Sequence, residues 1–132
     1  MAIVLTNRKY SDIDLDFFAH PVTKDVVKKT DAEAVKRAIR YLVYTQHFER
    51  PFQPGIGCKV YRLLFEPMNY ITTIEIQKSI EEVLFNYEPR IAEYKINVIP
   101  NYDENRYDIE INFTIKNVNL PIVVTFYLER TR

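Results

Sequence analysis

The stretch EYKINVIPNYDENRYDIEINFTIK, residues 93–116, contains two alternating runs joined by the turn-like segment NYDEN. In the second run, apolar side chains alternate strictly with polar ones: Tyr107, Ile109, Ile111, Phe113 and Ile115 against Asp108, Glu110, Asn112 and Thr114. Because successive strand side chains point to opposite faces of a sheet, the pattern predicts two antiparallel strands with one buried face. We expect the other face to be wet or covered by a partner.

A third apolar run, LPIVVTFYLE at residues 120–129, follows this pair. From Ile122 to Leu128 it is apolar on both faces, which is typical of a strand covered on both sides rather than one that faces solvent. In so small a protein, we expect another chain to supply the second cover.

Helical spacing precedes the strands. The segment at residues 30–46 opens with a capping box, Thr30 with Glu33 three residues later. Its apolar residues then recur at helical intervals: Val35, Ala38, Ile39, Leu42 and Val43. The segment KVYRLLFEP, residues 59–67, predicts a short helix that Pro67 ends.

A third helix is predicted from about Thr72, capped with Glu75, up to the proline at position 89. One stripe of this helix is expected to be buried: Ile76, Ile80, Val83, Leu84 and Tyr87. The first thirty residues contain only short mixed segments, which predict short strands or extended arms.

These elements predict a single α+β domain over residues 1–132, as the length also favours. Residues 1–29 form an N-terminal arm with short strands, residues 30–88 the helical part, and residues 91–129 the C-terminal strands. We expect a small mixed or antiparallel sheet of three to four strands with helices packed on one face.

Composition narrows the class of function. Apolar residues make up 47% and charged residues 27%, the balance of an ordinary soluble globular protein, and 18 basic side chains cancel 18 acidic ones. That neutrality disfavours nucleic-acid binding, while 10 tyrosines and 8 phenylalanines provide large areas for protein contacts. The one cysteine, Cys58, cannot form an internal disulfide, and the N-terminal decapeptide does not resemble a secretory signal. We therefore expect the chain to work in a reducing cytoplasm.

Signals for cofactor or metal chemistry are missing from the sequence. His20, His47 and Cys58 are scattered without metal-ligand spacing, and PGIGCK lacks the ending of a phosphate-binding loop. A paired-carboxylate hydrolase with Glu88 as one member remains an alternative. However, the nearby Arg90 favours the charged carboxylate, opposite to what a general acid needs. We expect no enzyme, no cofactor and no metal.

The junction Glu88-Pro89-Arg90 contains two charged residues that are not needed to end a helix. The same Glu-Pro step occurs at Glu66 and Pro67, where no arginine follows. One interpretation is that Glu88 and Arg90 pair with each other or with a neighbouring helix end. The other is that this stiff corner presents an acceptor and a bidentate donor to a partner chain.

The loop RPFQPGIGC, residues 50–58, contains both glycines of the chain. One interpretation is a rigid turn in which Phe52 shields the core. In the other, Arg50 and Phe52 contact a neighbouring protein.

Five motifs together resemble the sheath-initiator family of baseplate wedge proteins from contractile phage tails, whose relatives occur in type VI secretion baseplates. They are YSDID at residues 10–14, RPFQPGIGC at 50–58, LFEPM at 64–68, NYEPRI at 86–91 and INVIPNYD at 96–103. Each motif alone is weak, but their order and spacing over nearly the whole chain are specific.

The resemblance implies a structural protein similar to the interlocking domain of tail sheath subunits. It implies docking of Glu88, Pro89 and Arg90 on the core bundle of the baseplate wedge, and a sheet edge that accepts sheath strands. We place that edge at residues 122–128. Within this strand, we expect the residues that bind the partner to be Ile122, Val124, Phe126 and Leu128.

The resemblance also implies where the chain acts and with what. The expected partners are wedge core-bundle proteins, the tail sheath protein and tail tube or tube-initiator proteins, without nucleic acid or membrane. Several copies would surround the tail axis of a virion baseplate assembled in the host cytoplasm. A lysozyme-like peptidoglycan hydrolase, a label this family has carried, is the alternative, and a generic adaptor without a tail role is a third interpretation.

Overall fold

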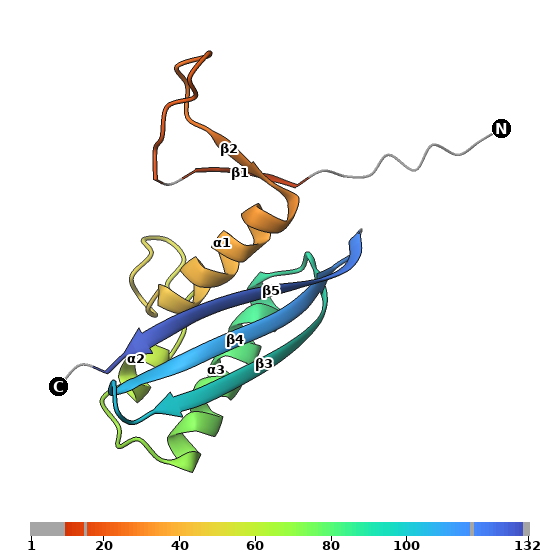
Figure 1. Ribbon diagram of the computed structural model, residues 1–132. Helices are drawn as coiled ribbons and strands as arrows, with labels where there is room; N and C mark the ends of the chain where they lie inside the picture. Colours follow the sequence, from red (N-terminus) through yellow and green to blue (C-terminus); the bar gives the residue numbers. More distant parts are fainter. Residues whose placement is uncertain (1–9, 15, 117, 131–132) are drawn as a thin grey trace.

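In the computed structural model, which describes residues 10–14, 16–116 and 118–130, three helices pack on a three-stranded sheet, and a two-stranded arm projects from them (Figure 1). The first residues of the predicted arm, 1–9, lie outside the described residues. The elements in chain order are β1 (Ser11–Ile13), β2 (Lys28–Thr30), α1 (Asp31–Tyr44), α2 (Val60–Leu63), α3 (Tyr70–Tyr87), β3 (Ile91–Asn101), β4 (Arg106–Ile115) and β5 (Val118–Glu129). This is the α+β class predicted from the sequence.

The sheet has the order β3-β4-β5 and is antiparallel throughout, so β3 and β5 are its edges. Ile96 of β3 lies opposite Ile111 of β4, which lies opposite Val124 of β5, so the apolar rows share one face. The five alternating apolar residues of β4 are all buried, as predicted, and the polar residues between them are half-buried. The helices cover the apolar face, with α3 packed on β3 and α1 in contact with β5.

Strand β5 is buried within this chain on one face only, and the cover that another chain is expected to supply on the second face stays a prediction. Val124, Phe126 and Leu128 are buried in the core, but Val123 and Tyr127 on the opposite face are 47% and 52% exposed. The apolar run therefore reflects one core face plus exposed apolar residues. The described chain supplies no second cover.

The helices begin differently from their predictions. Thr30 is the N-cap residue of α1, but its side chain makes no capping hydrogen bond, and Glu33 pairs with Lys36 instead. The third helix starts at Tyr70 rather than Thr72, because the Asn69 side chain accepts a hydrogen bond from the Thr72 N–H at 2.8 Å. Both predicted capping boxes were wrong, although both helices exist.

The predicted buried stripes are confirmed over most of their length. In α1, Val35, Ile39, Leu42 and Val43 are buried, while Ala38 is half-buried. In α3, Ile76, Ile80, Val83 and Leu84 are buried, but Tyr87 is 37% exposed. Tyr87 instead donates a hydrogen bond at 2.9 Å to the Gly55 carbonyl, which ties the α1–α2 loop to the end of α3.

The arm is attached to α1 through Asp14, which is 2% exposed. Its carboxylate accepts from Arg37 of α1 and lies 3.5 Å from Lys29 of β2. Burial acts to raise the pKa of Asp14, but the Asp16 N–H and the two cations outweigh it and lower that pKa. The arm therefore has a fixed root, while its tip carries exposed apolar residues that include Phe17, Phe18 and Val22.

Candidate functional site

A tight corner joins α3 to β3. The helix ends because Pro89 disfavours helical geometry at the preceding residue, and Glu88 accordingly has φ −122° and ψ 75°. The Glu88 N–H still bonds the Leu84 carbonyl at 3.0 Å, while the Lys116 N–H bonds the Arg90 carbonyl at 3.0 Å. The corner is thus fixed on both sides, and Pro89 is exposed at its tip.

The charges flanking Pro89 bind each other. Arg90 donates from Nε to Glu88 Oε1 at 2.6 Å and from Nη2 to Oε2 at 2.7 Å. The Glu88 side chain is only 2% exposed, whereas that of Arg90 is 22% exposed. The hydrogen bonds to Glu88 raise the pKa of Arg90 above its usual value. Of the two interpretations drawn from sequence, the internal pair is the one present in the isolated chain.

Arg90 also connects the corner to the arm. Its guanidinium carbon lies 5.8 Å from the ring centre of Tyr10, within the range of a cation–π contact. The two hydrogen bonds to Glu88 use Nε and Nη2 of Arg90 and leave its Nη1 out. The corner therefore presents Pro89 and part of a guanidinium at the surface, with the carboxylate beneath them.

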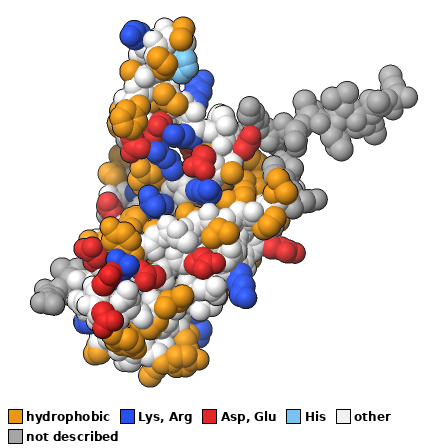
Figure 2. All heavy atoms as spheres, in the orientation of Figure 1, with side chains coloured by type: hydrophobic (Ala, Val, Ile, Leu, Met, Phe, Trp, Pro, Cys, Tyr) orange, Lys and Arg blue, Asp and Glu red, His pale blue; other side chains and the backbone are white. Residues whose placement is uncertain are grey.

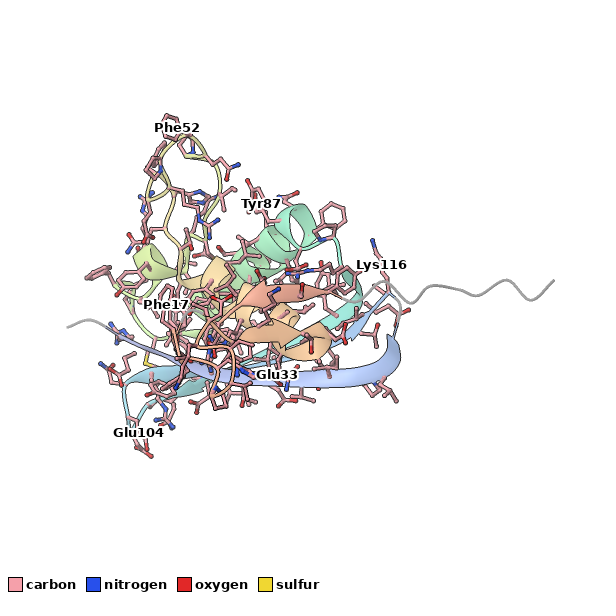
Figure 3. All side chains as sticks on the ribbon, turned by 90° about the horizontal axis from the view of Figure 1, so that it is seen from above. Phe17, Glu33, Phe52, Tyr87, Glu104 and Lys116 are labelled. Carbon is pink, nitrogen blue, oxygen red and sulfur yellow. The ribbon has the colours of Figure 1, made fainter. Side chains whose placement is uncertain are left out.

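The second candidate surface is the loop between α1 and α2. Phe52 is fully exposed and has a φ of 68°, a left-handed conformation uncommon for a bulky residue. Figure 3 shows its ring at the outer tip of the loop, pointing away from the body. The prediction that Phe52 shields the core is wrong. Arg50 is also exposed, so both residues named for partner contact lie at the surface.

The third candidate surface is the free edge of β5. The Arg130 N–H bonds the Asn105 carbonyl at 3.1 Å, so even-numbered residues of this segment direct their backbone groups toward β4. Odd-numbered residues from Pro121 to Glu129 must then direct theirs away from the sheet. Pro121 fits this alternation, because a proline needs no backbone N–H at an outward position.

The four β5 residues named for partner binding do not point outward. Val124, Phe126 and Leu128 are core residues, 7%, 7% and 3% exposed, and Ile122 is half-buried against the same core. Their side chains hold β5 on the helices rather than forming a contact surface. The outward backbone groups belong instead to residues such as Val123 and Thr125.

Tyr44 is a functional candidate that sequence reasoning missed. Its hydroxyl donates to the Tyr127 carbonyl at 3.1 Å, and its ring centre lies 5.9 Å from that of Phe126. Burial raises the pKa of Tyr44, so the hydroxyl stays protonated at neutral pH. Its position near the end of a predicted helix suggests no such role, and no local signal links it to a strand 83 residues away.

The described residues contain no cluster of three or more side chains suited to a metal ion. Among them, no helix has the length and apolar character needed to span a bilayer. Cys58 is buried against Ser79 Oγ at 3.2 Å, and burial raises the pKa of its thiol. Its environment is therefore that of a structural rather than a reactive cysteine.

Solved structures of other proteins share this architecture. A Geobacter sulfurreducens crystal structure described as a candidate tail lysozyme matches with a TM-score of 0.70 and 25% identity, over 76% of this chain and 91% of that one. A chain of the type VI secretion system baseplate complex shares the fold, with a TM-score of 0.65 and 15% identity, over 76% of this chain and 93% of that one. The fold is thus one found in baseplates.

Sequence comparison identifies the family. The family model described as baseplate wedge protein gp25 matches residues 29–120 of this sequence. The baseplate wedge protein gp25 of Enterobacteria phage T4 is 36% identical over 109 residues, 83% of this chain and 82% of that protein. The chain belongs to the baseplate wedge protein gp25 family, which confirms the resemblance seen in its motifs and places it among structural components of contractile-tail baseplates.

Proposed function

We propose that this chain docks on the core bundle of a baseplate wedge through its Glu88-Pro89-Arg90 corner and templates the first ring of tail sheath along β5. The observation that carries the proposal is the corner itself, an exposed proline beside a guanidinium fixed by a buried carboxylate. Rigid, partly desolvated arginines are favoured at protein interfaces, since little freedom is lost when they bind.

We assign different roles to the three corner residues. Glu88 is the positioning residue, because both its oxygens already accept from Arg90. Pro89 and the exposed part of Arg90 are then the groups that contact helices of the wedge. This assignment replaces a corner in which Glu88 itself offers an acceptor to the partner.

Exchanging Pro89 for glutamine should weaken wedge docking about tenfold, because the change removes the exposed ring while leaving the Glu88–Arg90 pair in place. Pro67→Gln is the matched control, since Pro67 is also an exposed proline after a glutamate. Affinity for the purified wedge core-bundle proteins measures the effect. Equal affinities for both variants and the wild type would remove the corner from the interface.

The β5 edge supports the sheath-templating part. Exposed edges of unpaired backbone groups are sites where extended segments of other chains add as strands. The opposite edge, β3, is less suited, because the charged residues Glu93 and Lys95 lie within it. From Ile122 to Leu128, β5 has neither charge nor proline.

Thr125→Pro should reduce sheath assembly on purified baseplates about tenfold, because it removes an outward N–H from the centre of the edge. Bonds to β4 come from the neighbouring residues, so the sheet should persist, as circular dichroism can verify. Thr125→Ala keeps the N–H and should assemble sheath normally. Full sheath growth with the proline variant, counted by electron microscopy, would show that β5 is not the template.

Secondary contacts complete the proposed role. Arg50 and Phe52 extend from the body on the α1–α2 loop and are suited to touch a wedge neighbour or the tail tube. Several copies would then surround the tail axis after assembly in the host cytoplasm, with proteins as partners and neither nucleic acid nor membrane involved.

A hydrolytic role is the second candidate, because one structural neighbour is described as a candidate tail lysozyme. Glu88 is poorly placed for it. A general acid must reach the glycosidic oxygen, whereas the Glu88 side chain is 2% exposed and held by Arg90. We infer a structural role, without cofactor or metal, for this carboxylate and for the chain.

A further inference from the structure

We propose that the slot beside β5 selects a strand whose helix-facing side chains are acidic, an inference that rests on the proposed templating function. The slot is bounded by the β5 edge and by α1, which contacts β5 and lies on its open side (Figure 1). A fourth strand added at this edge would therefore lie over α1, which the three-stranded sheet leaves partly uncovered.

The helix side of the slot carries positive charge. Lys36, Arg40 and Tyr44 are spaced by four residues, so they form one row along α1. Tyr44 at the end of this row touches β5, and Lys and Arg side chains, with acidic side chains among them, gather over α1 between the arm and the sheet (Figure 2). Within the described residues Arg40 has no ion-pair partner, while Lys36 has only the exposed Glu33.

The spacing of this row matches the edge. Four residues of helix rise about 6 Å, and two residues of strand span about 6.6 Å. Figure 1 shows α1 and β5 running in the same direction, so counting back from the Tyr44–Tyr127 contact by these steps sets Arg40 level with Thr125 and Lys36 level with Val123. Thr125 and Val123 are β5 residues whose backbone groups point outward. Each helix-facing side chain of an added strand, one for every two residues, would therefore lie near one cation.

Tyr44 marks one end of the slot. Because its hydroxyl bonds the outward carbonyl of Tyr127 and its side chain lies beside that carbonyl, we place the added strand between Pro121 and the Tyr127 N–H. Side chains of that strand alternate between the outer sheet face and α1. Carboxylates on the α1 side would pair with Lys36 and Arg40, whereas lysines there would repel them.

The test attaches a probe strand to the full chain. A flexible Gly/Ser linker after residue 132 carries a nine-residue Thr/Val strand with either Glu or Lys at each helix-facing position. Protected amides at Val123 and Thr125 report pairing with β5. We expect the Glu probe to melt about 4 °C above the Lys probe, and 1 M salt to shrink that difference.

Matched variants test the origin of the difference. Lys36→Gln/Arg40→Gln should abolish the preference for Glu, while Lys78→Gln, which removes an exposed charge from α3, should keep it. Pairing of both probes with equal melting temperatures would overturn charge selection but leave β5 as a strand-accepting edge. No protection with either probe would overturn strand acceptance as well. Wedge docking is decided separately by the Pro89 variant.

Discussion

Replacing Arg90 with alanine should lower the free energy of unfolding by about 3 kcal/mol, because the Glu88 carboxylate would stay buried without its partner. The side chain of Glu88 is 2% exposed, and Arg90 binds both its oxygens at 2.6 and 2.7 Å. Water can therefore replace the guanidinium only if the corner opens. Urea unfolding of both proteins at pH 7 measures the loss.

Two further variants separate charge from packing. Glu88→Gln alone should cost only about 1 kcal/mol, because Arg90 is 22% exposed and can turn to water. Adding Glu88→Gln to Arg90→Ala should recover about half of the loss, since no buried charge remains. A cost below about 1 kcal/mol for Arg90→Ala would mean that the pair does not brace the corner.

The expected loss of stability is larger for Arg90→Ala than for Glu88→Gln, and this difference affects how docking experiments should be interpreted. If the two charges only contacted a partner, either could be removed without harm to the fold. The buried pair implies that lost wedge binding by Arg90→Ala would mix misfolding with a lost contact. The Pro89 and Pro67 exchanges avoid this ambiguity, because both prolines are exposed and outside that pair.

Features set by short-range patterns were predictable from the sequence. The period-2 alternation of β4 follows from strand geometry at each residue, and all five of its apolar positions are buried. Capping was less predictable, because several nearby residues can perform it. At α3 a capping asparagine, Asn69, lies three residues before the predicted threonine and accepts the Thr72 N–H instead.

Features that depend on distant segments were not predictable in the same way. An apolar run such as Ile122 to Leu128 looks the same whether its second face meets helices or solvent, and only the packing shows Val123 and Tyr127 exposed. The Tyr44–Tyr127 hydrogen bond joins residues 83 positions apart, and its partner is a backbone carbonyl that carries no sequence signal. The candidate site therefore needed the fold, whereas the family could be recognised from motifs.

Replacing Gly57 with alanine should lower the free energy of unfolding by about 3 kcal/mol, because the site lacks room for a β-carbon. An added Cβ would lie 2.5 Å from Gln46 C and from His47 N, both backbone atoms that cannot rotate away. The φ of +156° adds strain for any residue with a side chain. Nearby, the Cys58 N–H bonds the Thr45 carbonyl at 2.8 Å and closes the base of the loop.

Gly55 supplies the control within the same loop. A Cβ there would approach nothing closer than the Tyr87 hydroxyl at 3.7 Å, so Gly55→Ala should change stability by less than about 0.5 kcal/mol. The Gly57 variant must separate the ends of the loop, which would also displace Phe52 from its place at the tip. Urea unfolding compares the variants. Similar stability for both would show that the ends of the loop can move apart freely and that the loop does not rigidly present Phe52 to a partner.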